Sequence, residues 1–242
     1  METSRVALVT GGTSGIGLET VRQFAAKGFE VYACSRSPFD RTALDEKLAV
    51  NVHHDVIDVG QPDQLIGWIN SIGKSKGQID VLVNNAAFVV KKSIEEFLPN
   101  DFVQSLQVNL LAVLESTKAA LPYLESTNCG VIINLSSMAA IDPFPGFSVY
   151  GACKAFIEVF TRAIATELLG RQVRCYSIRA GAVETPLLRS VLPEFPKEET
   201  LRPGQIAELI VRLAADTSIH KSGEPIELTV ETIDGYDLAE GE

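Results

Sequence analysis

Short apolar segments alternate along this chain with longer segments in which apolar residues recur every three or four positions. The short segments are residues 6–10, 30–34, 50–54, 79–83, 131–135, 173–178 and, with a weaker pattern, 226–229. Several are nearly continuous in Val, Ile and Leu, which is typical of strands buried on both faces of a parallel sheet. The pattern therefore predicts strands of this kind, separated by helices.

The longer segments predict amphipathic helices over residues 17–27, 63–74, 109–124, 150–169 and 203–215. In the first of these, Leu18, Val21, Phe24 and Ala25 fall on one face, and Gly28 follows as a stop signal. Strands alternating with helices favour an α/β fold, a doubly wound (Rossmann-type) parallel β-sheet with helices on both faces.

The length of 242 residues suits one domain of this class, so residues 1–242 are expected to form a single Rossmann-type domain. Two segments stand apart from the alternation. Residues 185–202 hold Pro186, Pro193 and Pro196 and predict a loop that covers the substrate as a lid. Residues 231–242 are acidic and contain no basic residue, which predicts a solvated tail.

Composition narrows the class of partner. The net charge of −10 disfavours nucleic acid, because a duplex-binding surface must neutralise phosphates. No apolar run reaches the roughly 20 residues of a membrane span, and the first residues lack the pattern of a secretory signal. The four cysteines are scattered without a Cys-x-x-Cys pair, which favours a reducing cytoplasm and no metal site.

A glycine-rich segment follows the first predicted strand. Gly11, Gly15 and Gly17 leave room for the backbone to turn tightly and to approach a pyrophosphate closely. The helix that follows offers unpaired N–H groups and the positive end of its dipole. A glycine-rich turn without a ligand is the alternative, but its place after the first strand favours a dinucleotide.

The end of the second predicted strand bears on the choice of cofactor. An NAD site commonly has a carboxylate here for the ribose hydroxyls, whereas this chain has Ser35 and Arg36. A guanidinium can bind a phosphate that a carboxylate would repel. NADP(H) is therefore favoured over NAD, with a plain surface arginine as the alternative.

Three side chains suggest acid–base chemistry. Tyr150 and Lys154 are four residues apart in a predicted helix and therefore share a face. A neighbouring ammonium favours the phenolate and would lower the tyrosine pKa from its usual value of about 10. Ser137 lies 13 residues before Tyr150, directly after a predicted strand, where ligand and catalytic groups gather in such sheets.

With these features in order, the chain resembles the short-chain dehydrogenase/reductase family over nearly its whole length. The motifs that carry the resemblance are residues 10–17, Asn84-Asn-Ala-Ala87, Asn109, Ser137, and Tyr150 with Lys154. The family often has Pro-Gly before the nicotinamide segment, where this chain has Ala180-Gly181. That difference removes no catalytic group.

The resemblance implies a role for each matching residue. Tyr150 would be the general acid or base, Lys154 would lower its pKa, Ser137 would polarise the carbonyl, and Asn109 would hold a proton-relaying water. Gly11, Thr13, Ser14 and Ile16 would line the pyrophosphate, Asp55 and Val56 the adenine, and Asn84 and Ala86 the adenosine. Gly181, Val183 and Thr185 would surround the nicotinamide, next to Tyr150 and Lys154.

The expected function is hydride transfer between NADP(H) and a carbonyl or secondary alcohol of an apolar small molecule. A β-ketoacyl carrier-protein reductase ranks second, because residues 123–129 contain no Lys or Arg to dock an acidic carrier. A non-catalytic NADP-sensing regulatory protein is the alternative from another class. The resemblance also implies a homodimer or homotetramer, assembled through the helices at 109–124 and 150–169.

Overall fold

The computed structural model describes residues 4–40, 42, 44–216 and 220–236. Its sheet has seven parallel strands in the order β3-β2-β1-β4-β5-β6-β7. The strands are β1 (Val6–Thr10), β2 (Glu30–Ser35), β3 (Val52–Val56), β4 (Val81–Asn84), β5 (Gly130–Leu135), β6 (Val173–Ala180) and β7 (Pro225–Leu228). The doubly wound Rossmann-type fold is therefore confirmed.

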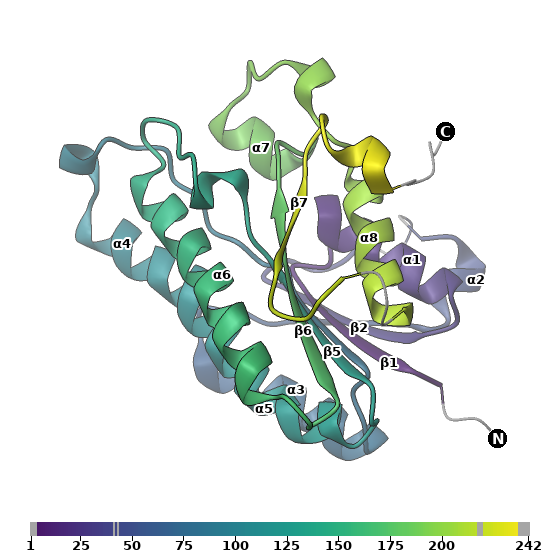
Figure 1. The fold of residues 1–242 in the computed structure, drawn as a ribbon. Coiled ribbons are helices and arrows are strands. Elements are labelled where there is room, and N and C mark those ends of the chain that lie inside the picture. The colour runs from purple at the N-terminus through teal and green to yellow at the C-terminus, as the bar shows by residue number, and fades with distance from the viewer. Residues whose placement is uncertain (1–3, 41, 43, 217–219, 237–242) are drawn as a thin grey trace.

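Helices cover both faces of this sheet (Figure 1). One face carries α1 (Gly15–Ala26) and α8 (Pro203–Ala215), which pack against each other. The other carries α3 (Pro62–Lys76), α5 (Ala112–Glu125) and α6 (Ser148–Glu167). Shorter helices are α2 (Glu46–Ala49), α4 (Pro99–Leu106) and α7 (Pro186–Val191), and single turns lie at Ile94–Glu96, Met138–Ala140, Lys197–Glu199 and Ile233–Tyr236.

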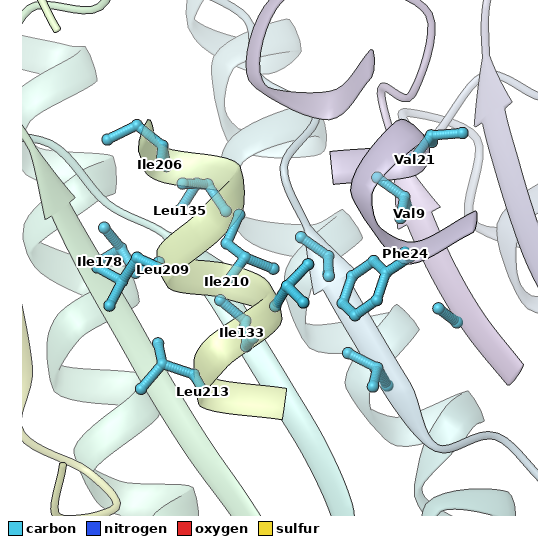
Figure 2. Close-up of a cluster of buried hydrophobic side chains, with 14 of the residues drawn as sticks. Val9, Val21, Phe24, Ile133, Leu135, Ile178, Ile206, Leu209, Ile210 and Leu213 are labelled. Atoms are coloured by element: carbon cyan, nitrogen blue, oxygen red, sulfur yellow. The ribbon is translucent and has the colours of Figure 1, made fainter. Parts of the chain in front are cut away.

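The strands divide their side chains between two apolar cores, because successive residues of a strand point to opposite faces. Ala7 and Val9 of β1 pack into the core beneath α1 and α8, whereas Val6 and Leu8 pack into the core beneath α3, α5 and α6. Figure 2 shows the first core, where Phe24 of α1 and Ile210 of α8 lie over strands β1 and β5. Both faces being buried explains the unbroken apolar runs of these strands.

Several expected elements differ from the structure. The third strand runs Val52–Val56, two residues later than expected. The helix expected over 109–124 begins at Pro99 and passes through a π-helical turn, Gln107–Leu111. Residues 185–202 are partly helical, since α7 and the Lys197–Glu199 turn lie within them. In the acidic tail, residues 233–236 form a turn, and residues 237–242 lie outside the described part.

Strand β1 pairs with β2 on one side and with β4 on the other. Strands β2 and β3 therefore extend the sheet in one direction from β1, and β4 to β7 extend it in the opposite direction. Parallel sheets of this class have a crevice at that point, outside the carboxyl ends of the strands. The glycine loop and the ends of β2, β4 and β5 all open onto this edge, which positions the candidate site.

Candidate active site

Two cavities of about 460 and 480 Å³ lie at the carboxyl edge of the sheet. The first is lined by the glycine loop and the ends of β2, β3 and β4, and the second by the turn after β5, the segment after β6, and α7. Both are lined by Ile16, Ser136, Tyr150, Thr185 and Leu187. Tyr150 therefore lies where the two cavities meet.

The glycine loop packs too closely for side chains. A Cβ on Gly17 would lie 2.1 Å from the carbonyl oxygen of Gly11, and Gly11 itself has a φ of +68°. Ser14 precedes α1 without a side-chain bond to its first turn, and no acidic residue occupies that turn. The first N–H groups of α1 thus face the cavity without an internal partner, as an anion site requires. Gly11, Thr13, Ser14 and Ile16 all line this cavity, as expected.

Thr10 and Asn85 join the ends of β1 and β4. The Thr10 hydroxyl accepts the N–H groups of Asn85 and Ala86, each at 3.1 Å, and Asn85 Nδ2 donates to the carbonyls of Thr10 and Gly11 at 2.9 and 3.1 Å. Sequence reasoning assigned Asn85 no role. Its position in the Asn-Asn-Ala-Ala motif was the available signal, but the motif does not show which asparagine faces the loop.

Asn84 does not reach the cavity. Its side chain is 5% exposed and forms a buried chain, donating to Asn134 at 2.8 Å and accepting from Ser116 at 2.7 Å. The expected contact of Asn84 with an adenosine is therefore not supported. Ala86, the other residue of that expectation, does line the first cavity together with Asn85.

The end of β3 corrects another expectation. Asp55 accepts the indole N–H of Trp68 at 2.9 Å, and Val56 is 56% exposed, so neither lines the cavity. Because the strand ends two residues later than expected, Ile57, Asp58 and Val59 line it instead. The apolar pattern of this edge strand was too weak to fix its end from sequence.

Ser35 and Arg36 line the first cavity at the end of β2. The Ser35 hydroxyl lies 2.6 Å from the carbonyl oxygen of Ser37 and 2.8 Å from Nε2 of His54. One hydroxyl hydrogen can serve only one acceptor, so Ser35 donates to Ser37 and accepts from His54. The turn that presents the exposed Arg36 is thereby held in place.

Asn109 occupies the π-helical turn and is 1% exposed. Its Nδ2 donates to the carbonyl of Phe88 at 2.8 Å, and its Oδ1 accepts the Phe88 N–H at 3.0 Å. Both polar atoms are thus occupied by the segment after β4, and the side chain does not line either cavity. Asn109 therefore holds the segment after β4 in place.

Ser137 and Tyr150 are brought together across the second cavity. Ser137 starts the turn after β5, and Tyr150 lies in the first turn of α6. Burial raises the pKa of Tyr150 to about 12, and a hydrogen bond from Ser137 counteracts part of this. The expected lowering of the tyrosine pKa is therefore reversed here, because desolvation of the phenolate outweighs that bond.

Lys154 is 3% exposed, one helical turn beyond Tyr150. Its Nζ donates to the carbonyl of Leu135 at 2.6 Å and lies 5.5 Å from the centre of the Tyr150 ring. Burial lowers the pKa of Lys154 from 10.5 to about 8. A lysine this deeply buried is costly, which makes Lys154 a candidate functional residue.

The segment after β6 closes the site. Gly181, Val183 and Thr185 line the second cavity, and Thr185 lines the first as well. Val183 bridges to Leu201, and Thr185 begins α7 by accepting the N–H of Leu188 at 3.2 Å. The three residues expected at a nicotinamide therefore lie beside Tyr150.

Within the described ranges, no three His, Cys, Asp or Glu side chains gather as they would around a metal ion. None of the described helices is long and apolar enough to cross a membrane.

A doubly wound parallel sheet with a glycine loop at its switch point defines an α/β protein of the Rossmann type. Comparison with known proteins identifies the family. Residues 5–194 match the short chain dehydrogenase family model. The 3-oxoacyl-[acyl-carrier-protein] reductase FabG of Thermotoga maritima is 33% identical over 234 residues, which cover 92% of this chain and 95% of that protein. The chain belongs to the short-chain dehydrogenase/reductase family of oxidoreductases, which confirms the resemblance.

Solved structures agree with the fold. ElxO with NADP bound matches with a TM-score of 0.83 at 25% identity, over 93% of this chain and 96% of ElxO. A 3-ketoacyl-(acyl-carrier-protein) reductase from Brucella melitensis complexed with NADH matches with the same TM-score at 24% identity and the same coverage of 93% and 96%.

Replacing Gly17 with alanine should weaken dinucleotide binding, because the new Cβ would collide with the Gly11 carbonyl and displace the start of α1. Fluorescence titration with NADPH should show at least about tenfold weaker binding. Gly67→Ala is the matched control, since nothing lies within 4 Å of that Cβ in α3. The control should bind normally and gain about 1 kcal/mol of stability.

Replacing Lys154 with methionine should raise stability more at pH 7 than at high pH, because burial lowers the pKa of the Lys154 ammonium from 10.5 to about 8. Between pH 8 and 10.5, Lys154 is protonated in the unfolded chain but neutral in the folded wild type. Wild-type stability therefore rises with pH in this range, and the stability difference between variant and wild type narrows. Urea unfolding of both proteins at pH 7 and 9.5 measures this. The exposed control Lys118→Met should show no such narrowing, and a gap independent of pH would contradict the assignment.

Proposed function

We propose that this protein is an NADP(H)-dependent oxidoreductase that interconverts a carbonyl and a secondary alcohol on an apolar small molecule. The hydrogen-bonded pair of Ser137 and Tyr150, placed where the two cavities meet, carries this proposal. Two hydroxyls converging on one point suit a carbonyl oxygen, which accepts two hydrogen bonds. One cavity then holds the cofactor and the other the substrate.

The residues of the first cavity fit a dinucleotide. The loop at Gly11 and Gly17 has no space for a side chain, and the N–H groups that begin α1 would bind the pyrophosphate. Asp58 and Val59 would contact the adenine, and Gly181, Val183 and Thr185 the nicotinamide. When bound, the nicotinamide supplies or accepts the hydride.

The side chains of the protein supply and accept the proton. In reduction, Tyr150 donates its hydroxyl proton to the carbonyl oxygen, and its raised pKa keeps that proton available at neutral pH. Ser137 polarises the same oxygen. The ammonium of Lys154 stands at the face of the Tyr150 ring and stabilises the phenolate that remains. In oxidation, that phenolate is the base.

The end of β2 supports a preference for NADP(H). Arg36 is exposed at the cavity, on a turn that Ser35 and His54 hold in place. A guanidinium beside the adenosine ribose would bind a 2′-phosphate with charge-assisted hydrogen bonds. No carboxylate stands at positions 35–37 to favour a free ribose.

The second cavity supports an apolar substrate without an anionic group. Its lining includes Met138, Phe144, Phe147, Leu188 and Phe195. Its charged lining residues within the described chain are the acids Asp142, Glu199 and Glu231, with no Lys, Arg or His. The nearby Arg189 is paired with Glu184 and donates to two carbonyls of its own segment. An anion entering here would lose its hydration without gaining a charged partner.

An acidic carrier protein needs basic residues near the cavity entrance, and the described lining of the second cavity has none. We therefore rank a β-ketoacyl carrier-protein reductase second, despite the likeness to FabG. A non-catalytic NADP sensor ranks below both. Such a protein gains nothing from a buried Lys154 beside a Ser137–Tyr150 pair, and the burial of an ammonium costs stability.

Assembly as a homodimer or homotetramer also belongs to this proposal. Exposed apolar residues lie on α4, α5 and the outer face of α6, including Phe102, Val103, Leu114 and Val159. Of these, Leu114 and Val159 lie in the helices at 109–124 and 150–169, through which the family resemblance implies assembly. Light scattering measures the oligomeric state. The free thiols of Cys34, Cys129, Cys153 and Cys175 fit a reducing, cytoplasmic setting.

The Tyr150→Phe variant should lose at least about 100-fold in carbonyl reduction, because the proton donor is removed. Binding of NADPH, measured by fluorescence, should stay within about threefold. Tyr123→Phe is the control. The Tyr123 hydroxyl, on α5, bonds to Asn70 of α3, and Tyr123 lines neither cavity. Undiminished turnover in Tyr150→Phe would remove Tyr150 as the proton donor.

The Arg36→Ser variant should weaken NADPH binding about 10- to 100-fold, the usual effect of losing charge-assisted bonds, and leave NADH binding unchanged. Parallel titrations with the two cofactors measure this difference. The exposed Arg162→Ser should alter neither, because Arg162 lies away from both cavities. Equal losses for the two cofactors would show that Arg36 does not recognise the phosphate.

A further inference from the structure

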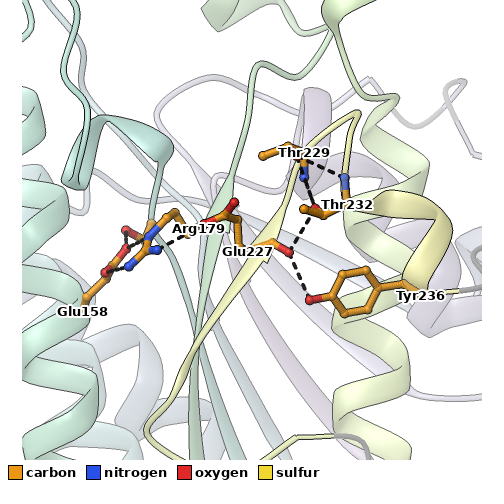
Figure 3. A network of polar contacts seen from close by, with 7 residues as sticks. Glu158, Arg179, Glu227, Thr229, Thr232 and Tyr236 are labelled. Carbon is orange, nitrogen blue, oxygen red and sulfur yellow. Dashed lines mark hydrogen bonds and ion pairs between the residues drawn. The ribbon is translucent and has the colours of Figure 1, made fainter.

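A buried ion pair lies directly behind the candidate catalytic groups. Glu158 of α6 and Arg179 of β6 form two parallel bonds, Arg179 Nε to Glu158 Oε1 at 2.9 Å and Nη2 to Oε2 at 2.6 Å (Figure 3). The side chains are 7% and 17% exposed. This fork geometry fixes both position and orientation, unlike a pair at the surface.

The ion pair continues to the last strand. Arg179 Nη1 donates to Glu227 Oε2 at 3.2 Å, across the β6–β7 pairing. The Glu227 carbonyl in turn accepts the hydroxyl of Tyr236 at 3.0 Å (Figure 3). Thr229 and Glu231, which follow β7, line the second cavity. The pair therefore joins α6 to the strand that leads to the substrate rim.

The same carboxylate reaches the turn that carries Ser137. Glu158 Oε1 accepts the hydroxyl of Ser136 at 2.9 Å, and Ser136 directly precedes Ser137. Lys154, one helical turn before Glu158, donates to the carbonyl of Leu135 at 2.6 Å. Leu135 and Ser136, which directly precede Ser137, are thus bonded to successive turns of α6.

We propose that Glu158 and Arg179 are positioning residues for the reaction, holding Ser137 in place against Tyr150 through Ser136. The role rests on the proposed reductase function, because only a substrate held by both hydroxyls requires their spacing to be fixed. A displacement of about 1 Å at such a pair can cost about 100-fold in rate.

Stability alone is a weak reason for this network. Replacing a buried ion pair with apolar side chains is often neutral for stability, since the desolvation of two charges offsets their attraction. A bidentate pair does, however, define a distance and an angle that apolar contacts leave adjustable. Because the pair lies between the turn that carries Ser137 and the helix that carries Tyr150, this fixed geometry can set the spacing of the two hydroxyls.

Steady-state kinetics of Arg179→Met, with cofactor bound, tests the proposal. The kcat for reduction should fall about 10- to 100-fold. KM and the Kd for NADPH should stay within about threefold. Arg179→Lys, which keeps the charge without the fork, should recover part of the loss, and Glu158→Gln should behave like Arg179→Met. If Ser136 transmits the effect, Ser136→Ala combined with Arg179→Met should be no slower than the slower single variant.

The control is Arg171→Met, which breaks the Arg171–Glu125 ion pair beyond the far end of α6. It should leave kcat unchanged. If Arg179→Met and Glu158→Gln lower the melting temperature but keep full kcat per folded molecule, the network is merely structural and the proposal is wrong.

A second measurement needs no substrate. Amide hydrogen exchange in residues 134–140 should quicken at least about tenfold in Arg179→Met, because the Ser136 N–H bonds to Ile178 beside this network. Exchange in β1 should not change. If no carbonyl compound is reduced by the wild type, the proposed function fails, and unchanged exchange in 134–140 then separately overturns the positioning role.

Discussion

The pairing of β1 with β2 on one side and with β4 on the other is the constraint on which the rest of the molecule depends. Because the sheet extends from β1 in two opposite directions, the loops after β1 and β4 separate and leave a crevice. Thr10 and Asn85 hold the two loops at a fixed spacing across that point. The absence of side chains at Gly11 and Gly17 then brings the backbone close enough to serve as a ligand surface.

Polar groups buried behind this crevice do most of the positioning. Lys154 and Glu158 lie one turn apart on α6, and each bonds to the chain at the end of β5. Asn109 similarly holds the segment after β4 through both of its polar atoms. Each of these groups loses its hydration on folding and regains its hydrogen bonds only in one arrangement. Their burial therefore specifies a geometry more than it contributes to stability.

The electrostatics of the site follow from the same burial. Desolvation raises the pKa of Tyr150 and lowers that of Lys154, so burial favours the neutral form of each side chain. The two cavities differ in their charge. The first offers Arg36 and the start of α1 to an anionic cofactor, whereas the described lining of the second offers no cation, which suits an apolar carbonyl compound.

By itself the sequence determined the alternation of strands and helices, because strands buried on both faces require unbroken apolar runs and leave little ambiguity. It also determined the family, and the order and spacing of its motifs pointed to Ser137, Tyr150 and Lys154 as candidate site residues. Only the tertiary structure decided which neighbouring residue faces the crevice: Asn85 rather than Asn84, and Asp58 rather than Asp55. A shift of one or two residues at the end of a strand changes the direction of a side chain without changing the local pattern. The roles of Glu158 and Arg179 were likewise invisible, because 21 residues of chain separate two groups that meet only when β6 packs beside α6.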